Sequence, residues 1–438
     1  MINTRQQPRV IITYGRSLMA LTAAHNLGKN GCDVIGCDDV DLTVLKFSKH
    51  TSNYFTHASF DKDIDAYLDD MEHYIKKYKP DDDRPYILMP MFRDAKILAQ
   101  HRKRFKDLIT ITAPDINSIN QVTPKDNLVK TCEKLNVTAP KTVIIEDDNQ
   151  LDSIGDKFDF PVLIKPTTGR GGRGIHIIKD QDELKSRYQN HKEKYDTFPL
   201  IQELVDGEDY CLCVLCDNGK IVAHMAYKNL HTFPRDSGAG IMRQTVDDKF
   251  FLDTATKLLK GLNWHGVAEL DFKWNEQKDS PAYLIEVNSR FWAGLFHSVE
   301  SGVNFPWLTY QLFADGKVTD NVNVDIGKKT KIPGLLTLAS AQEFFDQEDS
   351  FKNLQTSWSA LWSNKNNEKA QTRMTNFAKS FRNLLDAPLL ENYDKITQDD
   401  DDVISELSLG DDPMTTLGIL FIVSSLLKHG ELPPELKS

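Results

Sequence analysis

Residues 161–174 read Pro-Val-Leu-Ile-Lys-Pro-Thr-Thr-Gly-Arg-Gly-Gly-Arg-Gly, and their pattern is the strongest indication of fold in the chain. A short apolar strand ends at Lys165, and a glycine-rich loop follows at 167–174. Glycines let backbone N–H groups approach an anion closely, and a lysine ammonium adds a compact positive charge. We therefore predict a phosphate-binding loop, with a flexible surface hairpin as the alternative that any such short motif leaves open.

A second motif, at 264–290, reads as two strands joined by a hairpin. Side chains alternate between the two faces of a strand, so the acidic residues of each strand share one face. Opposed carboxylates destabilise a strand pair unless a hard cation such as Mg²⁺ lies between them. The apolar and aromatic residues around the second strand favour this metal site over a solvated polar face. The predicted face carries Glu269 and Asp271 on the first strand, and Glu286, Asn288 and Arg290 on the second.

The motifs and their order resemble the ATP-grasp superfamily over roughly residues 10–318. Within it, the chain looks most like the predicted carboxylate–amine ligase branch, close to the carbamoyl-phosphate synthase and biotin carboxylase type. Ser289 stands where family members usually carry proline, which should loosen the turn and leave its neighbours in place. The matching segments are Thr123-Pro-Lys125-Asp126, 137–142, 160–166, the glycine-rich loop, 201–209, Glu286-Val-Asn288-Ser-Arg290 and 301–306.

The resemblance implies an α/β and α+β protein with an ATP-grasp fold. We expect an N-terminal parallel α/β (pre-ATP-grasp) domain over 1–115, a two-lobed ATP-grasp domain over 116–330 and a mainly helical C-terminal extension over 331–438. In the first region strand and helix patterns alternate, and the first turn lacks the glycines of a dinucleotide-binding fingerprint, which argues against NAD. The predicted elements there are strands at 10–14, 34–37, 86–89 and 108–111 and a helix at 18–28.

The resemblance also implies a site for ATP with Mg²⁺ or Mn²⁺. Both lysines would reach the phosphates, the lobe junction would hold the adenine, and an acid would accept hydrogen bonds from the ribose, a role for which Glu208 competes with Asp209. The implied ATP-binding residues are Lys125, Lys165, Gly171, Gly172, Gln202, Glu203, Val205 (through its backbone) and Asp209. The implied metal ligands are Asp271, Glu286 and Asn288, with Glu269 as a further option. The implied catalytic residues are Arg290 and Lys165.

Basic residues within 224–246 stand out in an acidic chain, and they suit a substrate that carries a carboxylate. The alternative is that they solubilise a loop. We expect Arg243 and Lys228 to contact substrate ahead of Arg235 and His231. Arg16 and Arg93, near predicted strand ends, are weaker candidates, because surface arginines are common.

The composition is that of an ordinary globular enzyme. The chain has 438 residues, 40% hydrophobic and 27% charged, and its net charge of −11 argues against a general nucleic-acid binder. No signal sequence or spanning run is visible, so we expect a cytoplasmic protein. Cys211, Cys213 and Cys216 lie in an apolar run that reads as a buried strand, with Cys216 on the opposite face, which favours packing over metal binding.

From residue 331 the character changes. Helical spacing at 340–350 and 354–385, an acidic run at 399–402 and an uncharged segment at 414–427 follow one another. We interpret the uncharged segment as a helix packed on the body, with an interfacial helix as the alternative.

These features together predict an ATP-dependent ligase that joins a small-molecule carboxylate to an amine through an acyl phosphate. A bicarbonate-phosphorylating enzyme and a nucleotide-binding protein without catalysis are the alternatives. The sequence identifies neither the acid nor the amine, and it leaves the oligomeric state open, a homodimer being one option.

Overall fold

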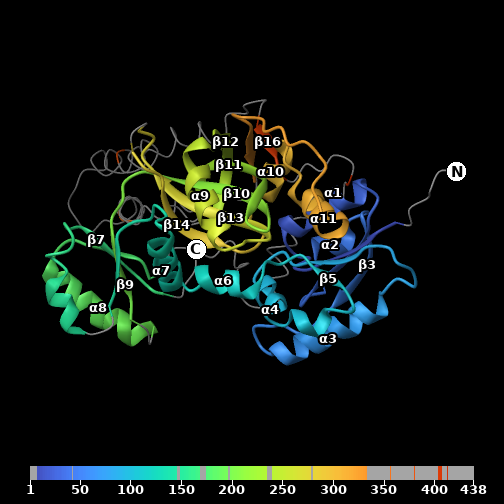
Figure 1. Cartoon of the computed structure of the whole chain (residues 1–438), viewed down its shortest axis with the longest axis horizontal. Helices are drawn as coiled ribbons and strands as arrows, with labels where there is room; N and C mark the ends of the chain where they lie inside the picture. Colours follow the sequence, from blue (N-terminus) through green and yellow to red (C-terminus); the bar gives the residue numbers. More distant parts are fainter. Residues whose placement is uncertain are drawn as a thin grey trace, which may run out of the picture.

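The computed structural model describes residues 7–41, 43–145, 148–167, 174–195, 198–233, 239–277, 280–332 and 403–406, and the single residues Thr356, Lys379 and Asp412. The strands of this part of the chain form three sheets, which Figure 1 shows with their helices. Among the described residues, no helix is long and apolar enough to cross a membrane.

The first sheet is parallel, and it runs in the order β3-β2-β1-β4-β5. Its central strands are almost entirely buried, because helices α1 and α11 pack on one face and α3 and α4 on the other. Its strands are β1 (Arg9–Ile12), β2 (Asp33–Asp38), β3 (Thr51–Thr56), β4 (Tyr86–Met89) and β5 (Thr110–Ile111). The helices of this region are α1 (Leu18–Lys29), α2 (Val44–Phe47), α3 (Ile64–Lys77), α4 (Asp94–Gln100), α5 (Arg102–Phe105) and α6 (Ile116–Val122).

The parallel sheet and the elements predicted in this region are confirmed, with ends within two residues of those expected. Strand β3 was not predicted. It is an edge strand of mostly exposed polar residues, so it lacks the apolar signal of its neighbours.

The second sheet has four strands in the order β6-β9-β7-β8, and it forms the lobe at the left of Figure 1. A separate core, which includes Ile164, Tyr188 and Ile201, lies between this sheet and helix α8. Its elements are β6 (Thr142–Ile144), the short 3₁₀ helix η1 (Asp148–Ser153), β7 (Val162–Lys165), β8 (His176–Ile178), α8 (Gln181–Tyr195) and β9 (Leu200–Glu203). Strand β7 ends at Lys165, as the sequence predicts.

The third sheet is the largest, with the order β14-β13-β10-β11-β12-β15-β16. Tyr210, Leu212 and Phe272 pack on α9 from one face, whereas Cys211, Cys213 and Met225 pack toward the N-terminal sheet from the other. The strands are β10 (Glu208–Asp217), β11 (Lys220–Phe233), β12 (Ala239–Val246), β13 (Gly266–Trp274), β14 (Tyr283–Asn288), β15 (Lys329–Lys331) and β16 (Val403–Ser405). The remaining helices are α7 (Lys125–Leu135), α9 (Lys249–Gly261), α10 (Leu295–Glu300) and α11 (Phe305–Asp315).

The C-terminal region contributes a strand that the sequence analysis did not predict. Strand β16 pairs in parallel with β15 at the edge of the large sheet. The helical segments expected at 340–350, 354–385 and 414–427 lie outside the described residues, apart from Thr356 and Lys379.

Candidate active site

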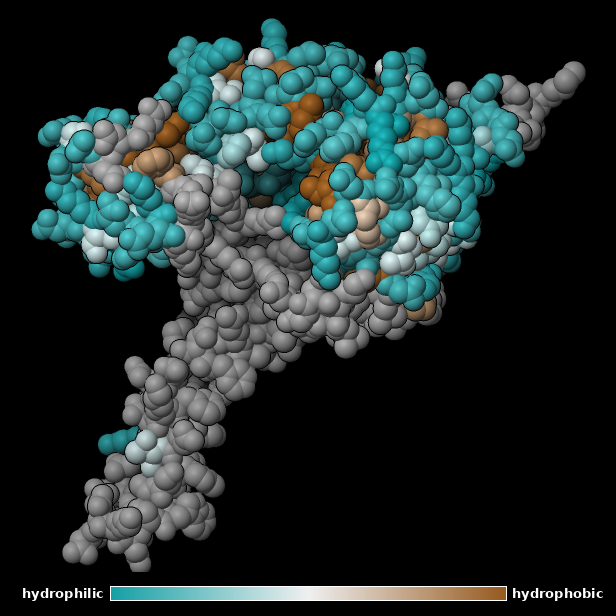
Figure 2. Space-filling view, turned by 90° about the horizontal axis from the view of Figure 1, so that it is seen from below, coloured by the Kyte–Doolittle hydropathy of each residue, from teal (hydrophilic) through white to brown (hydrophobic). Residues whose placement is uncertain are grey.

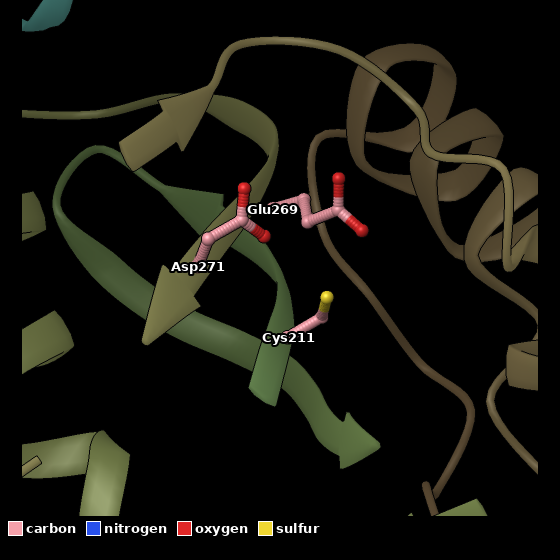
Figure 3. Close-up of side chains that lie close together, drawn as sticks. All are labelled: Cys211, Glu269 and Asp271. Carbon is pink, nitrogen blue, oxygen red and sulfur yellow. The ribbon is translucent and has the colours of Figure 1, made fainter. Parts of the chain in front are cut away.

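The predicted hairpin at 264–290 is the antiparallel pair β13–β14, and its register opposes acid to acid. Asp271 faces Glu286, and Glu269 faces Asn288. Glu269 is only 7% exposed. Figure 3 shows Glu269 and Asp271 projecting from β13 toward the same space, which Cys211 also enters. We call Glu269, Asp271, Glu286 and Asn288 the acid face.

Burial determines the charge state of the acid face. It raises the pKa of Asp271 well above its usual range, and the carboxylates of Glu269 and Glu286 raise this pKa further. Burial also raises the pKa of Glu269, although the charge of Arg290 and the Tyr227 hydroxyl, which donates to Glu269 at 2.7 Å, act in the opposite direction. Glu269 and Asp271 are therefore poised to take up either protons or a cation.

The donor set of the acid face fits a hard divalent cation, because opposed carboxylates and an amide supply oxygen ligands. The Asn288 amide nitrogen donates to Asp271 at 3.1 Å and to Glu269 at 3.4 Å. Its oxygen accepts from Arg290 at 3.3 Å. Since an amide can present either atom after rotation, Asn288 could offer its oxygen to an ion between the acids.

Cys211 lies beside the acid face, a position that the sequence analysis did not predict. Its sulfur and one carboxylate oxygen each from Glu269 and Asp271 all lie within 4.8 Å of one another. Burial raises the pKa of the Cys211 thiol well above its usual value. Cys216 packs into the opposite face of the sheet, as predicted. The signal for Cys211 is its register with Asp271, which only the pairing of β10 with β13 reveals.

Two lysines from other elements face this acid face. Lys125, at the first turn of α7, places its ammonium 3.5 Å from a Glu286 oxygen. The backbone N–H of Lys125 donates to Thr167 at 3.1 Å, which joins α7 to the strand-to-loop segment after β7. Lys165 is 7% exposed, and burial, together with the charge of Lys125, lowers the pKa of its ammonium to about 8. The two motifs thus bring cations and anions to opposite sides of one space.

Among the residues expected to bind the adenine and ribose, Gln202 contacts Lys165 directly. Gln202 accepts a hydrogen bond from Lys165 at 2.5 Å, and the Glu203 carboxylate accepts from the backbone N–H of Lys141 at 2.6 Å. Val205 is half-buried, and Asp209 is exposed beside Lys273, whose ammonium is 3.0 Å away. Lys273 is a further basic residue that sequence reasoning missed. Gly171 and Gly172 lie outside the described residues.

The surface of the molecule is hollowed beside the lobe that carries the small sheet (Figure 2). Figure 2 shows a hollow near the centre of the molecule, between the lobe at the left and the remaining described surface. The same lobe carries β7 and β9 in Figure 1. The N–H of Leu284 on β14 donates to the Thr138 carbonyl at 3.0 Å, so the segment before β6 is tied to the large sheet.

The substrate candidates that the structure describes are not gathered at one site. Arg243 is buried, and its guanidinium pairs with Glu406 and the Gly240 carbonyl. Lys228 stands in register with Tyr210 on the α9 face, opposite to the acid face, and pairs with Glu276 at 2.6 Å. His231 is half-buried on β11, and Arg235 lies outside the described residues.

The two weaker candidates also pair with acids. Arg16 is held by Asp38 and Asp39, and Arg93 forms a two-pronged contact with Asp61 at 2.5 and 2.8 Å. In this structure both charges are therefore neutralised within the N-terminal region.

Comparisons with known proteins agree with this architecture. Residues 121–240 match the model of a RimK-like ATP-grasp domain, and residues 197–332 match the model described as ATP-grasp in the biosynthetic pathway with Ter operon. A carbamoyl-phosphate synthase of Methanobrevibacter smithii is 24% identical over 189 residues, which cover 42% of this chain and 49% of the relative. The matched region thus spans about half the length of that relative.

Solved structures share the fold at low identity. The biotin carboxylase domain of Hydrogenobacter thermophilus 2-oxoglutarate carboxylase, in complex with MgADP, ADP and bicarbonate, is 17% identical with a TM-score of 0.58, over 74% of this chain and 73% of that one. N5-carboxyaminoimidazole synthetase from Staphylococcus aureus, complexed with ADP, is 15% identical with a TM-score of 0.56, over 73% of this chain and 81% of that one. Two ATP-grasp domain models thus match residues 121–332, and the chain shares its fold with solved ATP-grasp enzymes over about three quarters of its length.

Proposed function

We propose that the protein is an ATP-dependent ligase that joins a carboxylate to an amine through an acyl phosphate and releases ADP and phosphate. The observation that carries this proposal is the opposition of charges across one space. Asp271 and Glu286 face each other on β13–β14, and the Lys125 ammonium lies 3.5 Å from Glu286. Such an arrangement suits a polyphosphate with its metal, because the cations and the acids bind different parts of that complex.

Each residue has a role that follows from its charge. Lys125 and Lys165 would hold the phosphates that are not transferred, and Arg290 would stabilise charge on the transferring group. Mg²⁺ or Mn²⁺, held by Asp271, Glu286 and Asn288, with Glu269 as a further ligand, would neutralise the phosphate oxygens. The MgADP complex of the similar biotin carboxylase domain supports this choice of cofactors.

The chemistry needs no nucleophile from the protein. A carboxylate is a poor acyl donor, because its leaving oxygen is too basic. Attack by the carboxylate oxygen on the γ-phosphorus breaks the bond to ADP and forms a mixed anhydride. The amine then attacks the acyl carbon, phosphate leaves with the bonding electron pair, and the amine loses a proton.

The nucleotide's base and sugar would lie over the lobe junction. Gln202, Glu203 and Val205 would line the adenine, and Asp209 would accept hydrogen bonds from the ribose. The half-buried position of Val205 and the exposed Asp209 carboxylate support these roles. Gly171 and Gly172 would lie over the phosphates in the glycine-rich loop, and Arg243, Lys228, Arg235 and His231 stay proposals for substrate contact.

A bicarbonate-phosphorylating enzyme is the second candidate. The similarity to a carbamoyl-phosphate synthase and to a carboxylase domain solved with bicarbonate favours it. Bicarbonate would take the place of the organic carboxylate, and the same residues would act on the phosphoryl group.

A coupled assay of ADP release over a matrix of acids and amines tests the proposal. ADP formation that depends on an organic acid plus an amine supports the ligase, and dependence on bicarbonate alone supports the second candidate. With ¹⁸O in the carboxyl group of the acid, the acyl-phosphate route places label in the released phosphate. Labelled AMP would contradict that route, and nucleotide binding without turnover of any pair would contradict catalysis.

A further inference from the structure

An aromatic ring from the N-terminal region lies against the candidate catalytic arginine. The guanidinium carbon of Arg290 is 4.8 Å from the centroid of the Phe92 ring. Phe92 follows strand β4 of the parallel sheet, whereas Arg290 follows β14 of the large sheet, so the contact joins two sheets. Arg290 also donates to the Phe291 carbonyl at 2.8 Å and to the Asn288 side-chain oxygen at 3.3 Å.

The Phe92 ring is itself held in a stack. It is 5% exposed and lies parallel to the Tyr14 ring, with centroids 4.8 Å apart and planes 12° apart. The guanidinium of Arg16 lies 5.3 Å from the Tyr14 centroid, on the ring that supports Phe92. Arg16 in turn is fixed by two buried acids, Asp38 and Asp39. The stack therefore ends in a charge that cannot easily move.

The backbone around Phe92 is fixed as well. The N–H of Phe92 donates to the Asp94 carboxylate at 3.2 Å, and the N–H of Met91 donates to the Thr13 hydroxyl at 3.0 Å. Asp94 is buried at the first turn of α4. These bonds leave the ring little freedom, so its face stays turned toward Arg290.

We propose that Phe92 is a positioning residue, which holds the Arg290 guanidinium in the orientation that phosphoryl transfer requires. The inference rests on the proposed function, because it takes Arg290 as the group that meets the transferring phosphoryl. Hydrogen bonds fix only part of the guanidinium: within the described residues, its partners are the Phe291 carbonyl and the Asn288 oxygen. The Phe92 ring packs against the Arg290 guanidinium and restrains its orientation. This contact uses none of the guanidinium N–H donors.

An aromatic face suits this task better than an acid would. A carboxylate at position 92 would neutralise Arg290 and compete with the phosphoryl oxygens for its N–H groups. The ring attracts the cation through its quadrupole and leaves the charge available. The N-terminal region would thus contribute to catalysis through geometry rather than through a polar contact with substrate.

The test compares a ground-state ligand with a mimic of the transferring phosphoryl group, and it needs no knowledge of the acid or amine. Binding of MgADP and of MgADP with aluminium fluoride is measured by calorimetry on the full chain. We expect Phe92→Leu to leave MgADP affinity within about twofold and to weaken the aluminium fluoride complex about tenfold, the size of a buried cation–ring contact. Phe92→Tyr and Phe92→Trp, which keep an aromatic face, should retain most of the affinity.

A double-mutant cycle shows whether Phe92 acts through Arg290. Arg290→Ala should weaken the aluminium fluoride complex, and Phe92→Leu should add no further loss in that background. Phe313→Leu is the matched control, because Phe313 lies on α11 against His265 and belongs to neither element of the contact. Thermal unfolding of every variant reports whether it folds.

The outcomes separate this inference from the proposed function. Wild-type protein that binds no MgADP would count against the proposed function itself. Wild-type protein that binds both complexes, with Phe92→Leu unchanged, would overturn the role of Phe92 alone. Equal loss of both complexes in Phe92→Leu, or losses that add in the double variant, would also overturn it.

Discussion

Two groups of charged side chains lie on the same face of the large sheet, and they differ in how the chain neutralises them. On β13–β14, Asp271 opposes Glu286. On β12, Arg243 pairs with Glu406, and both side chains are 1% exposed. Tyr227 lies between the groups, since its hydroxyl donates to Glu269 while the Arg243 guanidinium is 6.0 Å from its ring centroid.

The difference lies in the source of the compensating charge. Glu406 lies in the turn after β16, and its carboxylate neutralises the Arg243 guanidinium within the chain. The opposed acids of β13–β14 repel each other, and the chain offsets this repulsion only in part, through the Lys125 ammonium beside Glu286 and the charge of Arg290. Protons or a bound cation would offset more of it. Like charges that a fold sets opposite each other indicate a binding site, whereas a buried pair of opposite charges indicates a joint between segments.

The largest effect should follow from breaking the pair of opposite charges. Arg243→Met leaves the Glu406 carboxylate buried without its partner, and we expect a loss of about 3–5 kcal/mol in the free energy of unfolding. The double variant Arg243→Met with Glu406→Leu should recover much of it, because no charge is then left buried. Urea unfolding measures both.

Arg104→Met is the matched control for that measurement. Arg104 pairs with Asp69 and Glu72 at the surface, and such pairs contribute about 0–1 kcal/mol. A loss for Arg243→Met no larger than that of the control would contradict the structural role of the Arg243–Glu406 pair.

The second effect should appear in turnover and not in folding. Glu286→Gln removes one acid of the acid face, and Lys165→Ala removes a cation on the opposite side of the space. We expect each to lower the rate of ADP release by about 10²–10³, the usual cost of one electrostatic contact to a reacting group. Glu286→Gln should also leave the metal-free protein as stable as wild type or more stable, because it relieves repulsion.

Steady-state ADP release and thermal unfolding in EDTA provide the two readouts. Glu72→Gln, at the exposed pair with Lys76, is the control for loss of an acid. Turnover of either site variant at the wild-type rate would remove that residue from the proposed mechanism.

Sequence reasoning found the acid face because alternation along a strand is local. The side chains at 269 and 271 share a face in any strand, and their partners Glu286 and Asn288 lie on the next strand of the same hairpin. Cys211 could not be assigned in this way, because its neighbours on β13 depend on a pairing across about sixty residues. Glu406 and Phe92 reach their partners from still farther along the chain.

The substrate candidates show the same limit in another form. Their positive charge was visible in the sequence, but the acids that pair with Lys228 and Arg243 were not. Whether a basic side chain is available to bind substrate depends on its tertiary contacts. Composition alone therefore could not rank the four candidates by their availability. Lys165 was found because the end of its strand fixes where it projects, whereas Lys125 was found through the family resemblance.

The third effect concerns the cationic side of the space. Burial lowers the pKa of Lys165 to about 8, so the ammonium loses its proton as the pH rises through that value. Nucleotide affinity should therefore change little below pH 7 and should fall about tenfold between pH 7 and 9, since the bound phosphate requires the charged form. Calorimetric titration with ADP measures this, and Lys165→Ala should bind weakly with little dependence on pH in this range.

The smallest effect should come from protons on the acid face. In the metal-free protein, burial raises the pKa values of both Asp271 and Glu269, and neighbouring carboxylates raise that of Asp271 further, so the folded state holds protons more tightly than the unfolded state does. Their contribution to stability is complete below the unfolded pKa values near 4, and it is lost as the pH rises through the folded values.

On lowering the pH from 8 to 5.5 in EDTA, wild type should gain stability relative to Asp271→Asn, by about 2–4 °C in Tm for each 1 kcal/mol. The comparison with Asp271→Asn cancels the buried acids outside the acid face, such as Asp38 and Asp94, because their protonation is common to both proteins. Saturating Mg²⁺ should reverse the trend, because protons then compete with the ion and stabilisation by the metal weakens as the pH falls. Parallel pH profiles for wild type and Asp271→Asn, with and without Mg²⁺, would mean that the opposed acids are neutralised within the chain, as Arg243 and Glu406 are, and the contrast between the two groups would be lost.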